Sequence, residues 1–288
     1  MPELPEVETI VRDLNKNLKN KKIKKVTADH AKTVAPLSIS TFTKRLKGQV
    51  IEDVKRQAKV IIITLADRDF ILTHLKMTGQ LIYQPKTGTL VVGGHPQPGG
   101  GVDLPNKFTR IVMTFEDGST LYFNDMRKFG WMRLMSKSDM EKYLQDYGVE
   151  PLSKEFTTEK LREIFDRFPN RTIKQSLFDQ TKIAGLGNIY IDEACFLSGL
   201  KPDRKVTTLK DEDIENLKKS IVEVLKLSIK KRGTSARNYV TADGTKGGFV
   251  THLNVYSRAG EDCKVCSIKI SKIKHAGRGT HFCTNCQK

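Results

Sequence analysis

The stretch CKVCSIKISKIKHAGRGTHFCTNC, residues 263–286, decides the fold of the last part of this 288-residue chain. It contains two Cys-x-x-Cys pairs, Cys263 with Cys266 and Cys283 with Cys286, separated by sixteen residues. Four thiolates at this spacing are typical of a structural, tetrahedral Zn²⁺ site, in which no coordination position stays open for a substrate. The stretch therefore predicts a zinc ribbon, a rigid β-hairpin that holds one zinc ion.

The loop of this hairpin and the chain as a whole are basic. Arg278 stands between two glycines, where a guanidinium can approach a surface closely and grip a phosphate with its planar fork. A solvated basic loop is the alternative, but the chain carries 50 Lys and Arg against 33 Asp and Glu, a net charge of +17. This excess favours a polyanionic partner. No apolar run approaches the ~20 residues of a membrane span, so we expect nucleic acid and a cytoplasmic protein.

The first residues, Met1-Pro2-Glu3, offer a nucleophile. Removal of Met1 would leave the secondary amine of Pro2 as the free N-terminus. An α-amine titrates near ~7.7–8.0 and a lysine near ~10.4, so far more of the α-amine is neutral at pH 7. Such an amine can attack an aldehyde carbon and form an imine, with Glu3 as a candidate proton carrier. Many chains begin with Met-Pro without this chemistry, so the dipeptide alone leaves both interpretations open.

The first half of the chain predicts a β-rich domain led by one helix. Apolar residues recur at helical spacing between residues 5 and 18, and the pattern then changes to strands. The expected strands are 22–28, 50–56, 60–65, 70–77 and 110–115, with a hairpin turn at 116–119. The Gly- and Pro-rich segment 84–107 predicts a surface loop without regular structure.

The second half predicts helices, at 158–168, 173–179, 188–197 and 211–231. Gly185 and Gly187 directly precede the third of these helices. They bring backbone N–H groups to a helix start, which favours phosphate; a plain turn between helices also needs glycine, so both interpretations stay open. Cys195 lies in an apolar helical stretch and is expected to be a small core residue.

Six stretches together resemble the formamidopyrimidine-DNA glycosylase family of bacterial base-excision repair enzymes. They are PELPEVE at 2–8, HLKMTG at 74–79, DMRKFG at 125–130, GVEPL at 148–152, GLGNIY at 185–190 and HAGRGT at 275–280, in family order. The resemblance implies an α+β fold with an N-terminal β-sandwich and flanking helices, a helix–two-turn–helix domain and a C-terminal zinc-ribbon finger, with DNA in the cleft between. The expected boundaries are 1–136 for the catalytic sandwich, 137–153 for a linker, 154–233 for the helical domain, and 234–288 for the lesion-loop segment and the four-cysteine zinc finger.

The resemblance also implies the chemistry. The damaged nucleotide is flipped out of the duplex, because its glycosidic carbon is unreachable inside the stack. Pro2 attacks C1′ and forms an imine as the base leaves, Glu3 shuttles protons, and β- and then δ-elimination cut the strand. Lys59 matches the family's lysine at the lesion-flanking phosphate, which is also described as a proton donor in elimination. Arg278 matches the arginine of the zinc loop, and we count it with the catalytic residues.

Five further residues are implied as DNA contacts. Asn188 completes a phosphate clamp with Arg278. Met77 and Phe129 fill the gap that the flipped base leaves, and Arg127 hydrogen-bonds the orphaned cytosine. Arg171 belongs to the basic segment that precedes 172–174. Without the resemblance, Met77 and Phe129 would be interpreted as core residues at strand ends, and Lys59 as a solvated hairpin lysine.

Some positions depart from the family pattern. Phe108 stands where a DNA-contacting histidine is usual, and the basic segment around Asn170 and Arg171 is thin. The stretch Gln57-Ala58-Lys59-Val60 lacks the usual glycine and aromatic residue around the lysine, Ser257 replaces a frequent glycine, and the segment 84–107 is longer than usual. These departures remove no catalytic group but bear on the phosphate contacts. The segment 234–249 matches the lesion-capping loop, with no assignable contacts.

We therefore expect a bifunctional DNA glycosylase and AP lyase that removes oxidised purines, namely 8-oxoguanine and formamidopyrimidines. It would hold one structural Zn²⁺ and act as a monomer on double-stranded DNA in the bacterial cytoplasm, at the nucleoid during repair, with no membrane partner. The nearest alternative is the endonuclease VIII branch, which prefers oxidised pyrimidines and typically has glycine where this chain has Leu4. A zinc-ribbon protein that senses damage without cutting DNA is the alternative from another class, and it would need no free Pro2 amine.

Overall fold

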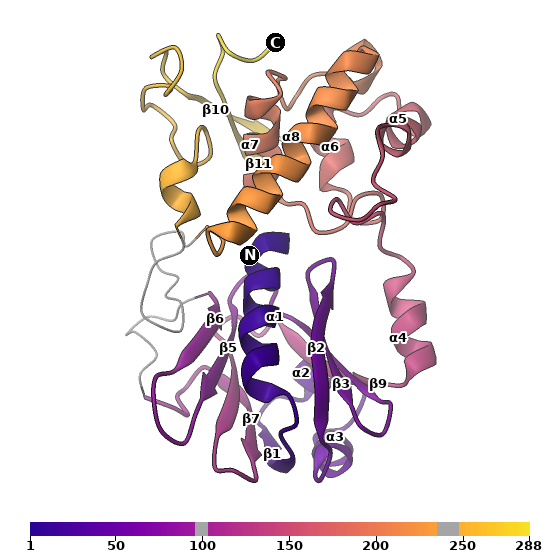
Figure 1. The fold of residues 1–288 in the computed structure, drawn as a ribbon, viewed down its shortest axis with the longest axis vertical. Coiled ribbons are helices and arrows are strands. Elements are labelled where there is room, and N and C mark those ends of the chain that lie inside the picture. Colours follow the sequence, from indigo (N-terminus) through magenta and orange to yellow (C-terminus); the bar gives the residue numbers. More distant parts are fainter. Residues whose placement is uncertain (96–102, 235–247) are drawn as a thin grey trace. The chain divides into compact units, whose positions relative to one another are not determined.

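The computed structural model describes residues 1–95, 103–234 and 248–288, which form two compact units (Figure 1). Unit 1 comprises Met1–Gln145 and Lys231–Gly248, and unit 2 comprises Asp146–Lys230 and Phe249–Lys288. Most of the expected lesion-capping loop and part of the Gly- and Pro-rich segment lie outside the described residues. No helix in the described part of the chain is long and apolar enough to cross a membrane.

Unit 1 is built on two antiparallel sheets whose inner faces share one core. The five-stranded sheet has the order β1 (Ile23–Ala28), β7 (Thr109–Phe115), β8 (Thr120–Asp125), β5 (Gly79–Gln84) and β6 (Val91–Gly94). The four-stranded sheet has the order β2 (Ile51–Gln57), β3 (Val60–Leu65), β4 (Phe70–His74) and β9 (Trp131–Met135). Buried side chains of both sheets, such as Ile63 and Phe123, belong to the same cluster, which makes this unit the expected β-sandwich.

The helix α1 (Leu4–Leu18) positions the N-terminus against this core. Its apolar residues at helical spacing, Val7, Ile10 and Leu14, are each at most 2% exposed. The helix begins at Glu3 through a reciprocal capping box with Glu6, which fixes the first turn. The rest of unit 1 adds three short helices, α2 (Ala31–Val34), α3 (Ile39–Leu46) and α4 (Lys137–Leu144).

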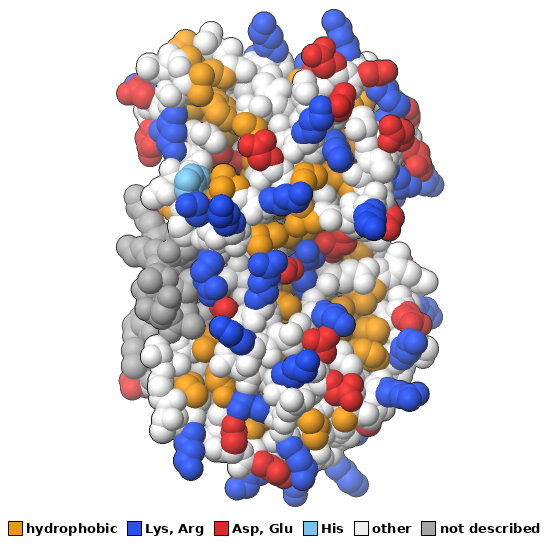
Figure 2. All heavy atoms as spheres, viewed as in Figure 1, with side chains coloured by type: hydrophobic (Ala, Val, Ile, Leu, Met, Phe, Trp, Pro, Cys, Tyr) orange, Lys and Arg blue, Asp and Glu red, His pale blue; other side chains and the backbone are white. Residues whose placement is uncertain are grey.

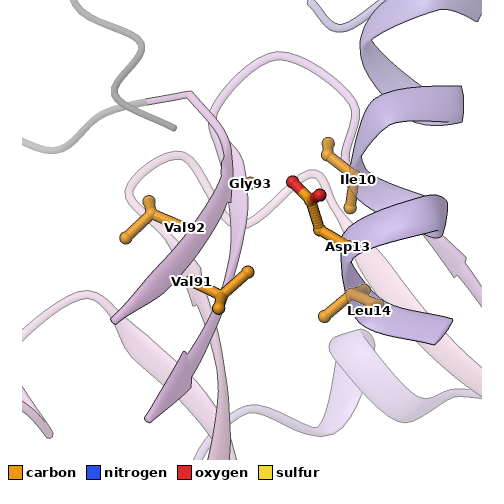
Figure 3. A pocket seen from close by; sticks show the side chains of 6 residues that line it. All are labelled: Ile10, Asp13, Leu14, Val91, Val92 and Gly93. Carbon is orange, nitrogen blue, oxygen red and sulfur yellow. The ribbon is translucent and has the colours of Figure 1, made fainter. Parts of the chain in front are cut away.

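One expectation for unit 1 is wrong. Part of the segment expected to lack regular structure forms β6, which pairs with β5 from Tyr83↔Val91 to Gln80↔Gly94. Figure 3 shows β6 facing α1 across a small apolar crevice between Val91 and Leu14. A Cβ at Gly93 would lie 2.7 Å from Cγ1 of Ile10. The strand can therefore approach the helix because a glycine faces it, a reason that the sequence pattern does not reveal.

A second difference concerns the strand expected at 70–77. The strand β4 ends at His74, and residues 75–78 form a turn instead. Lys76 has φ +50°, a left-handed conformation that a strand cannot contain. Met77 therefore lies in a turn rather than in a sheet. In addition, α4 occupies much of the segment expected to be a linker.

Unit 2 contains the expected helices followed by a hairpin. The helices are α5 (Thr158–Arg167), α6 (Ile173–Phe178), α7 (Asn188–Leu197) and α8 (Asp211–Lys230), with the 3-10 turns η1 (Val206–Thr208) and η2 (Phe249–His252). The hairpin pairs β10 (Ser271–His275) with β11 (Arg278–Phe282), and its turn is Ala276-Gly277. Cys195 is fully buried in α7, as expected for a core residue.

Candidate active site and metal centre

Pro2 and Glu3 are buried at the start of α1. The carboxylate of Glu3 accepts the amide of Glu6, and Oε2 of Glu6 accepts the amide of Glu3 at 3.0 Å. The other oxygen of Glu6, Oε1, accepts the amide and the hydroxyl of Thr234 at 2.8 and 2.9 Å. Glu6, which sequence reasoning did not single out, thus ties the first turn of α1 to the residues just before 235.

The free amine at this end of the chain lies in a partly desolvated place. Burial lowers the pKa of the Met1 amine, while the carboxylates of Glu3 and Glu6 oppose the shift and Lys59 adds to it. A lowered pKa increases the neutral, nucleophilic fraction of an amine at physiological pH. In a chain without Met1, the nitrogen of Pro2 would be the amine at this end.

Lys59 lies in the turn between β2 and β3 and is only 4% exposed. Burial lowers the pKa of Lys59 to about 8; the carboxylates of Glu3 and Glu6 oppose this shift, and the charge of Lys76 adds to it. The interpretation as a solvated hairpin lysine is therefore wrong. The structure brings Lys59 together with Glu3 and the N-terminus.

A contact between strand and helix explains why this turn is buried. Arg56 of β2 donates from Nε to Oε2 of Glu8 in α1 at 2.8 Å, and from Nη1 to the carbonyl of Ala58 at 3.4 Å. Ala58 itself is fully buried with φ +53°. The β2–β3 turn is thus drawn onto α1, which places Lys59 near the first turn of that helix.

The three residues expected to act on the duplex are surface residues of unit 1. Met77 is 44% exposed and Phe129 is 54% exposed, so neither is a core residue. Arg127 is exposed as well, with its Cζ 4.7 Å from the centre of the Phe129 ring. They come from two turns, the β4–β5 turn and the β8–β9 turn.

His74 begins the HLKMTG stretch, but the sequence pattern assigns it no role, as with Glu6. It is 7% exposed, and its Nδ1 accepts the amide of Lys76 at 2.9 Å. Burial, and then the charges of Lys76 and Lys59, lower the pKa of His74 to about 3. The imidazole is therefore neutral at pH 7, which lets Nδ1 act as the acceptor that shapes the turn.

The four cysteines of the tail form the metal centre in unit 2. Their sulfur atoms all lie within 4.8 Å of one another, with Cys263 and Cys286 3.9 Å apart and Cys266 and Cys283 3.4 Å apart. Zn–S bonds of ~2.3 Å in a tetrahedron place sulfur atoms ~3.8 Å apart. The residues present fit one Zn²⁺ ion, which would fasten the two knuckles of the ribbon.

A buried polar network fastens the ribbon to the helices of unit 2. Lys174 of α6 and Asp192 of α7 form an ion pair at 2.5 Å, and both side chains are at most 1% exposed. The other carboxylate oxygen of Asp192 accepts the amide of His281 in β11 at 2.9 Å. Because β11 begins at Arg278, the network fixes the backbone that carries Arg278.

Asn188 begins α7 and Arg278 begins β11, the helix and the strand that Asp192 connects. Nδ2 of Asn188 donates to the carbonyl of Gly279 at 2.9 Å, so one of its two amide protons is engaged there. Arg278 is exposed, and its Cζ lies 5.3 Å from the centre of the Phe178 ring. The structure thus brings these two residues together, as the sequence interpretation requires.

Arg171 is less available than the sequence suggested. Its Nη1 pairs with Oδ2 of Asp179 at 2.8 Å, and its Cζ lies 4.4 Å from the centre of the Phe168 ring. Over the visible surface of both units, Figure 2 shows many Lys and Arg side chains among acidic ones.

Family models match three segments of the chain. Residues 1–132 match the formamidopyrimidine-DNA glycosylase N-terminal domain, and residues 147–239 match the formamidopyrimidine-DNA glycosylase H2TH domain. Residues 260–288 match the zinc finger found in FPG and IleRS.

Curated relatives and solved structures agree with these models over the full length. The chain is 40% identical to formamidopyrimidine-DNA glycosylase of Shouchella clausii, with 100% of this chain and 99% of the relative covered. It is 38% identical to that of Carboxydothermus hydrogenoformans over 100% of both chains. A crystal structure of a Lactococcus lactis FPG mutant with Fapy-dG-containing DNA matches with a TM-score of 0.87 and 34% identity over 100% of both chains. A complex of Lactococcus lactis Fpg with DNA that contains an abasic site matches with the same score and identity over 99% of both chains.

Proposed function

This chain belongs to the formamidopyrimidine-DNA glycosylase family, whose function is that of a DNA glycosylase and AP lyase in base-excision repair, and we propose that its nucleophile is the amine of Pro2. The observation that carries the proposal is the surroundings of the N-terminus. Pro2 and Glu3 are buried where α1 begins, and the ammonium of Lys59, with its pKa lowered to about 8, interacts with Glu3. An amine, a carboxyl group and a lysine with a shifted pKa can supply the nucleophile and the proton transfers of imine formation and elimination.

The proposed steps use these groups in turn. The nitrogen of Pro2 attacks C1′ of the flipped nucleotide, the bond from C1′ to the base breaks, and the base leaves with a proton. Glu3 carries protons to and from the sugar: it protonates O4′, so that the bond from C1′ to O4′ breaks, the sugar ring opens and the imine forms. The resulting imine acidifies the proton at C2′, so its removal expels the 3′ phosphate in β-elimination, and δ-elimination then expels the 5′ phosphate. Lys59 supplies positive charge at the flanking phosphate and a proton for elimination.

Residues of both units are proposed to bind the DNA. Arg278 and Asn188 of unit 2 donate to phosphate oxygens, and the second amide proton of Asn188 serves this purpose while the first holds Gly279. Met77 and Phe129 of unit 1 fill the space of the flipped base, and Arg127 pairs with the opposite cytosine. Arg171 contributes charge rather than a direct contact, because Asp179 already engages it. The zinc ion supplies rigidity to the hairpin that begins at Arg278.

The substrates proposed are 8-oxoguanine and formamidopyrimidine nucleotides in double-stranded DNA, together with abasic sites. Two of the matched structures support this choice, since they are complexes with Fapy-dG-containing DNA and with DNA that contains an abasic site. We propose action as a monomer in the bacterial cytoplasm, at the nucleoid. We also propose the functional boundaries 1–136, 137–153, 154–233 and 234–288.

A two-product assay tests this function. Protein whose N-terminus is verified as Pro2 is incubated with a duplex that carries 8-oxoguanine opposite cytosine, and free base and cut strand are measured separately. The expected result is release of both, with Glu3→Gln losing base release by about 100-fold or more, the usual contribution of a general acid or base. Glu116→Gln, which removes an exposed carboxylate that pairs with Lys22 at 2.9 Å, is the matched control and should be fully active. Tight binding with neither product would instead favour a damage sensor.

A further inference from the structure

Two turns of unit 1, each carrying exposed side chains, adjoin the same end of one strand pair. Strands β5 and β8 are hydrogen-bonded neighbours, and their register pairs Gly79 with Asp125. The β4–β5 turn, which carries Met77, ends directly before Gly79, and the β8–β9 turn, which carries Arg127 and Phe129, begins directly after Asp125. The two turns are therefore next to each other, at the paired ends of β5 and β8.

A single buried carboxylate connects the two turns at this point. Asp125 is 0% exposed, and its Oδ1 accepts the hydroxyl of Thr78 in the first turn. The same Oδ1 accepts the amide of Arg127 in the second turn at 3.2 Å, and Oδ2 accepts the amide of Gly130 at 2.6 Å. The hydroxyl oxygen of Thr78 also accepts the amide of Arg127, at 3.1 Å. The two turns thus share a hydrogen-bonded junction made of Asp125 and Thr78.

Burying the Asp125 carboxylate at this junction costs free energy, which indicates a role beyond filling space. Among the residues that the structure describes, no Lys or Arg forms an ion pair with the Asp125 carboxylate; the nearby Arg110 donates to the Asp125 carbonyl at 3.0 Å and pairs with Asp29, so the hydrogen-bond donors to the carboxylate are neutral. A buried carboxylate held only by neutral donors is expensive unless each bond is well made. Apolar residues of similar size would close a turn without this cost.

The backbone of both turns shows why such a fastening is needed. Lys76 and Lys128 have φ +50° and +57°, a left-handed conformation that is disfavoured for side chains of this kind. A Cβ at Gly130 would lie 2.8 Å from Cζ of Phe123 and 3.1 Å from Oδ2 of Asp125, so the second turn passes close to the junction. Such conformations persist where the surrounding contacts determine them.

We propose that Asp125 and Thr78 are positioning residues that hold Met77, Arg127 and Phe129 as one preformed wedge. This inference rests on the proposed function, in which these three residues act on the duplex. Inserting side chains between base steps requires unstacking, which costs a few kcal/mol per step. A wedge that is already ordered adds no further cost for fixing the two turns relative to each other.

The test removes the hydroxyl of Thr78 without changing the size of the side chain. The readout is the ratio of kcat/KM for 8-oxoguanine opposite cytosine to that opposite adenine, since Arg127 is proposed to recognise cytosine. In Thr78→Val this ratio should fall about fivefold to tenfold, the range for one lost buried hydrogen bond, and Thr78→Ser should restore it. Cleavage of a single-stranded oligonucleotide with an abasic site needs no wedge, so its rate should stay unchanged.

Thr73→Val is the matched control. Thr73 is also 0% exposed, lies on strand β4, which leads into the first of the two turns, and its hydroxyl has no hydrogen-bond partner among the described residues. This variant should keep the ratio of the unmodified protein. Amide hydrogen exchange gives a second readout, in which Thr78→Val, but not Thr73→Val, should speed the exchange of Arg127 and Gly130. If Thr78→Val does not fold, Asp125→Asn is measured in the same way.

Two outcomes would overturn the inference in different ways. If Arg127→Ala lowers the ratio while Thr78→Val keeps both the ratio and the slow amide exchange, the junction does not position the wedge. If Arg127→Ala leaves the ratio unchanged, the proposed role of Arg127 fails, and the junction loses its purpose with it. A general loss in Thr78→Val that includes single-stranded cleavage would show a merely structural role.

Discussion

Individual residues of the site differ in how far the sequence could predict them. Pro2, Glu3 and Arg278 stand in short motifs and could be named before the structure was known. The burial of Lys59 could not, because it depends on the contact of Arg56 in β2 with Glu8 in α1, which are far apart in the sequence. Glu6 and His74 were missed for a similar reason, since their partners only meet in the folded chain.

The lowered pKa of Lys59 makes a prediction about pH. With a pKa of about 8, Lys59 is mainly protonated at pH 7 and loses its charge and its proton as pH rises above about 8. Strand cleavage should therefore fall on the alkaline side near pH 8, and in Lys59→Arg this fall should move to higher pH, because arginine stays protonated. Single-turnover rates of strand cleavage between pH 6 and 10 measure it.

Lys76 provides the control for this profile. Its charge contributes to lowering the pKa of Lys59, so Lys76→Gln should move the alkaline fall slightly upward. The free energy of unfolding changes with pH in the opposite direction to cleavage. Below about pH 8, keeping Lys59 protonated in its buried place destabilises the fold. This penalty disappears as pH rises toward 10.5, where the unfolded chain also loses the proton. An alkaline fall that stays in place in both variants would mean that another group titrates.

Helices and strands with regular apolar spacing were predictable, and segments governed by glycine or tight turns were not. The apolar face of α1 and the run of β-branched residues in β3 give their bounds within a residue or two. The strand β6 was missed because its packing depends on Gly93 facing Ile10, and α4 was missed because only one of its residues, Leu144, is buried. Of the zinc ribbon, the sequence predicted the ligands but not the network of Lys174 and Asp192 that holds it.

The metal centre leads to a prediction at the level of the ribbon. Chelation of zinc, or Cys283→Ser, should lower DNA affinity about 100-fold or more, because a hairpin without its ion no longer holds Arg278 in place. The N-terminal unit should stay folded, because none of the four ligands belongs to it. Fluorescence anisotropy with labelled duplex measures affinity, and circular dichroism follows folding.

Cys195, which lies outside the four-cysteine cluster, offers the matched control. Cys195 is fully buried in α7 and is not among the four clustered cysteines, so Cys195→Ala should keep one zinc ion per chain and its affinity for DNA. If Cys283→Ser binds DNA as tightly as the unmodified protein, the ribbon takes no part in binding.

For the whole molecule, charge is the property that can be counted without any structure. The net charge of +17 favours a polyanion, and DNA association should weaken as the salt concentration rises, because the release of counterions from DNA then becomes less favourable. Which of these charges can reach a phosphate depends on the fold, since Arg171 is engaged by Asp179 whereas Arg278 is exposed.

Salt dependence separates these two kinds of arginine. Arg278→Ala should reduce the slope of log affinity against log salt by about 1, because one phosphate contact is lost. Lys219→Ala, which removes a lysine already paired with Glu215 at 2.6 Å on α8, should leave the slope unchanged. Equal slopes for Arg278→Ala and the unmodified protein would show that Arg278 does not contact a phosphate.

Borohydride trapping decides whether the N-terminal amine is the nucleophile. Protein verified to begin at Pro2 is mixed with a duplex that contains 8-oxoguanine opposite cytosine, the imine is reduced with borohydride, and the modified peptide is identified by mass spectrometry. The predicted result is a covalent adduct on the peptide that begins with Pro2, and a strong loss of adduct in Pro2→Gly. No adduct at all, or an adduct of equal yield in Pro2→Gly that maps to Lys59, would contradict the assignment of Pro2.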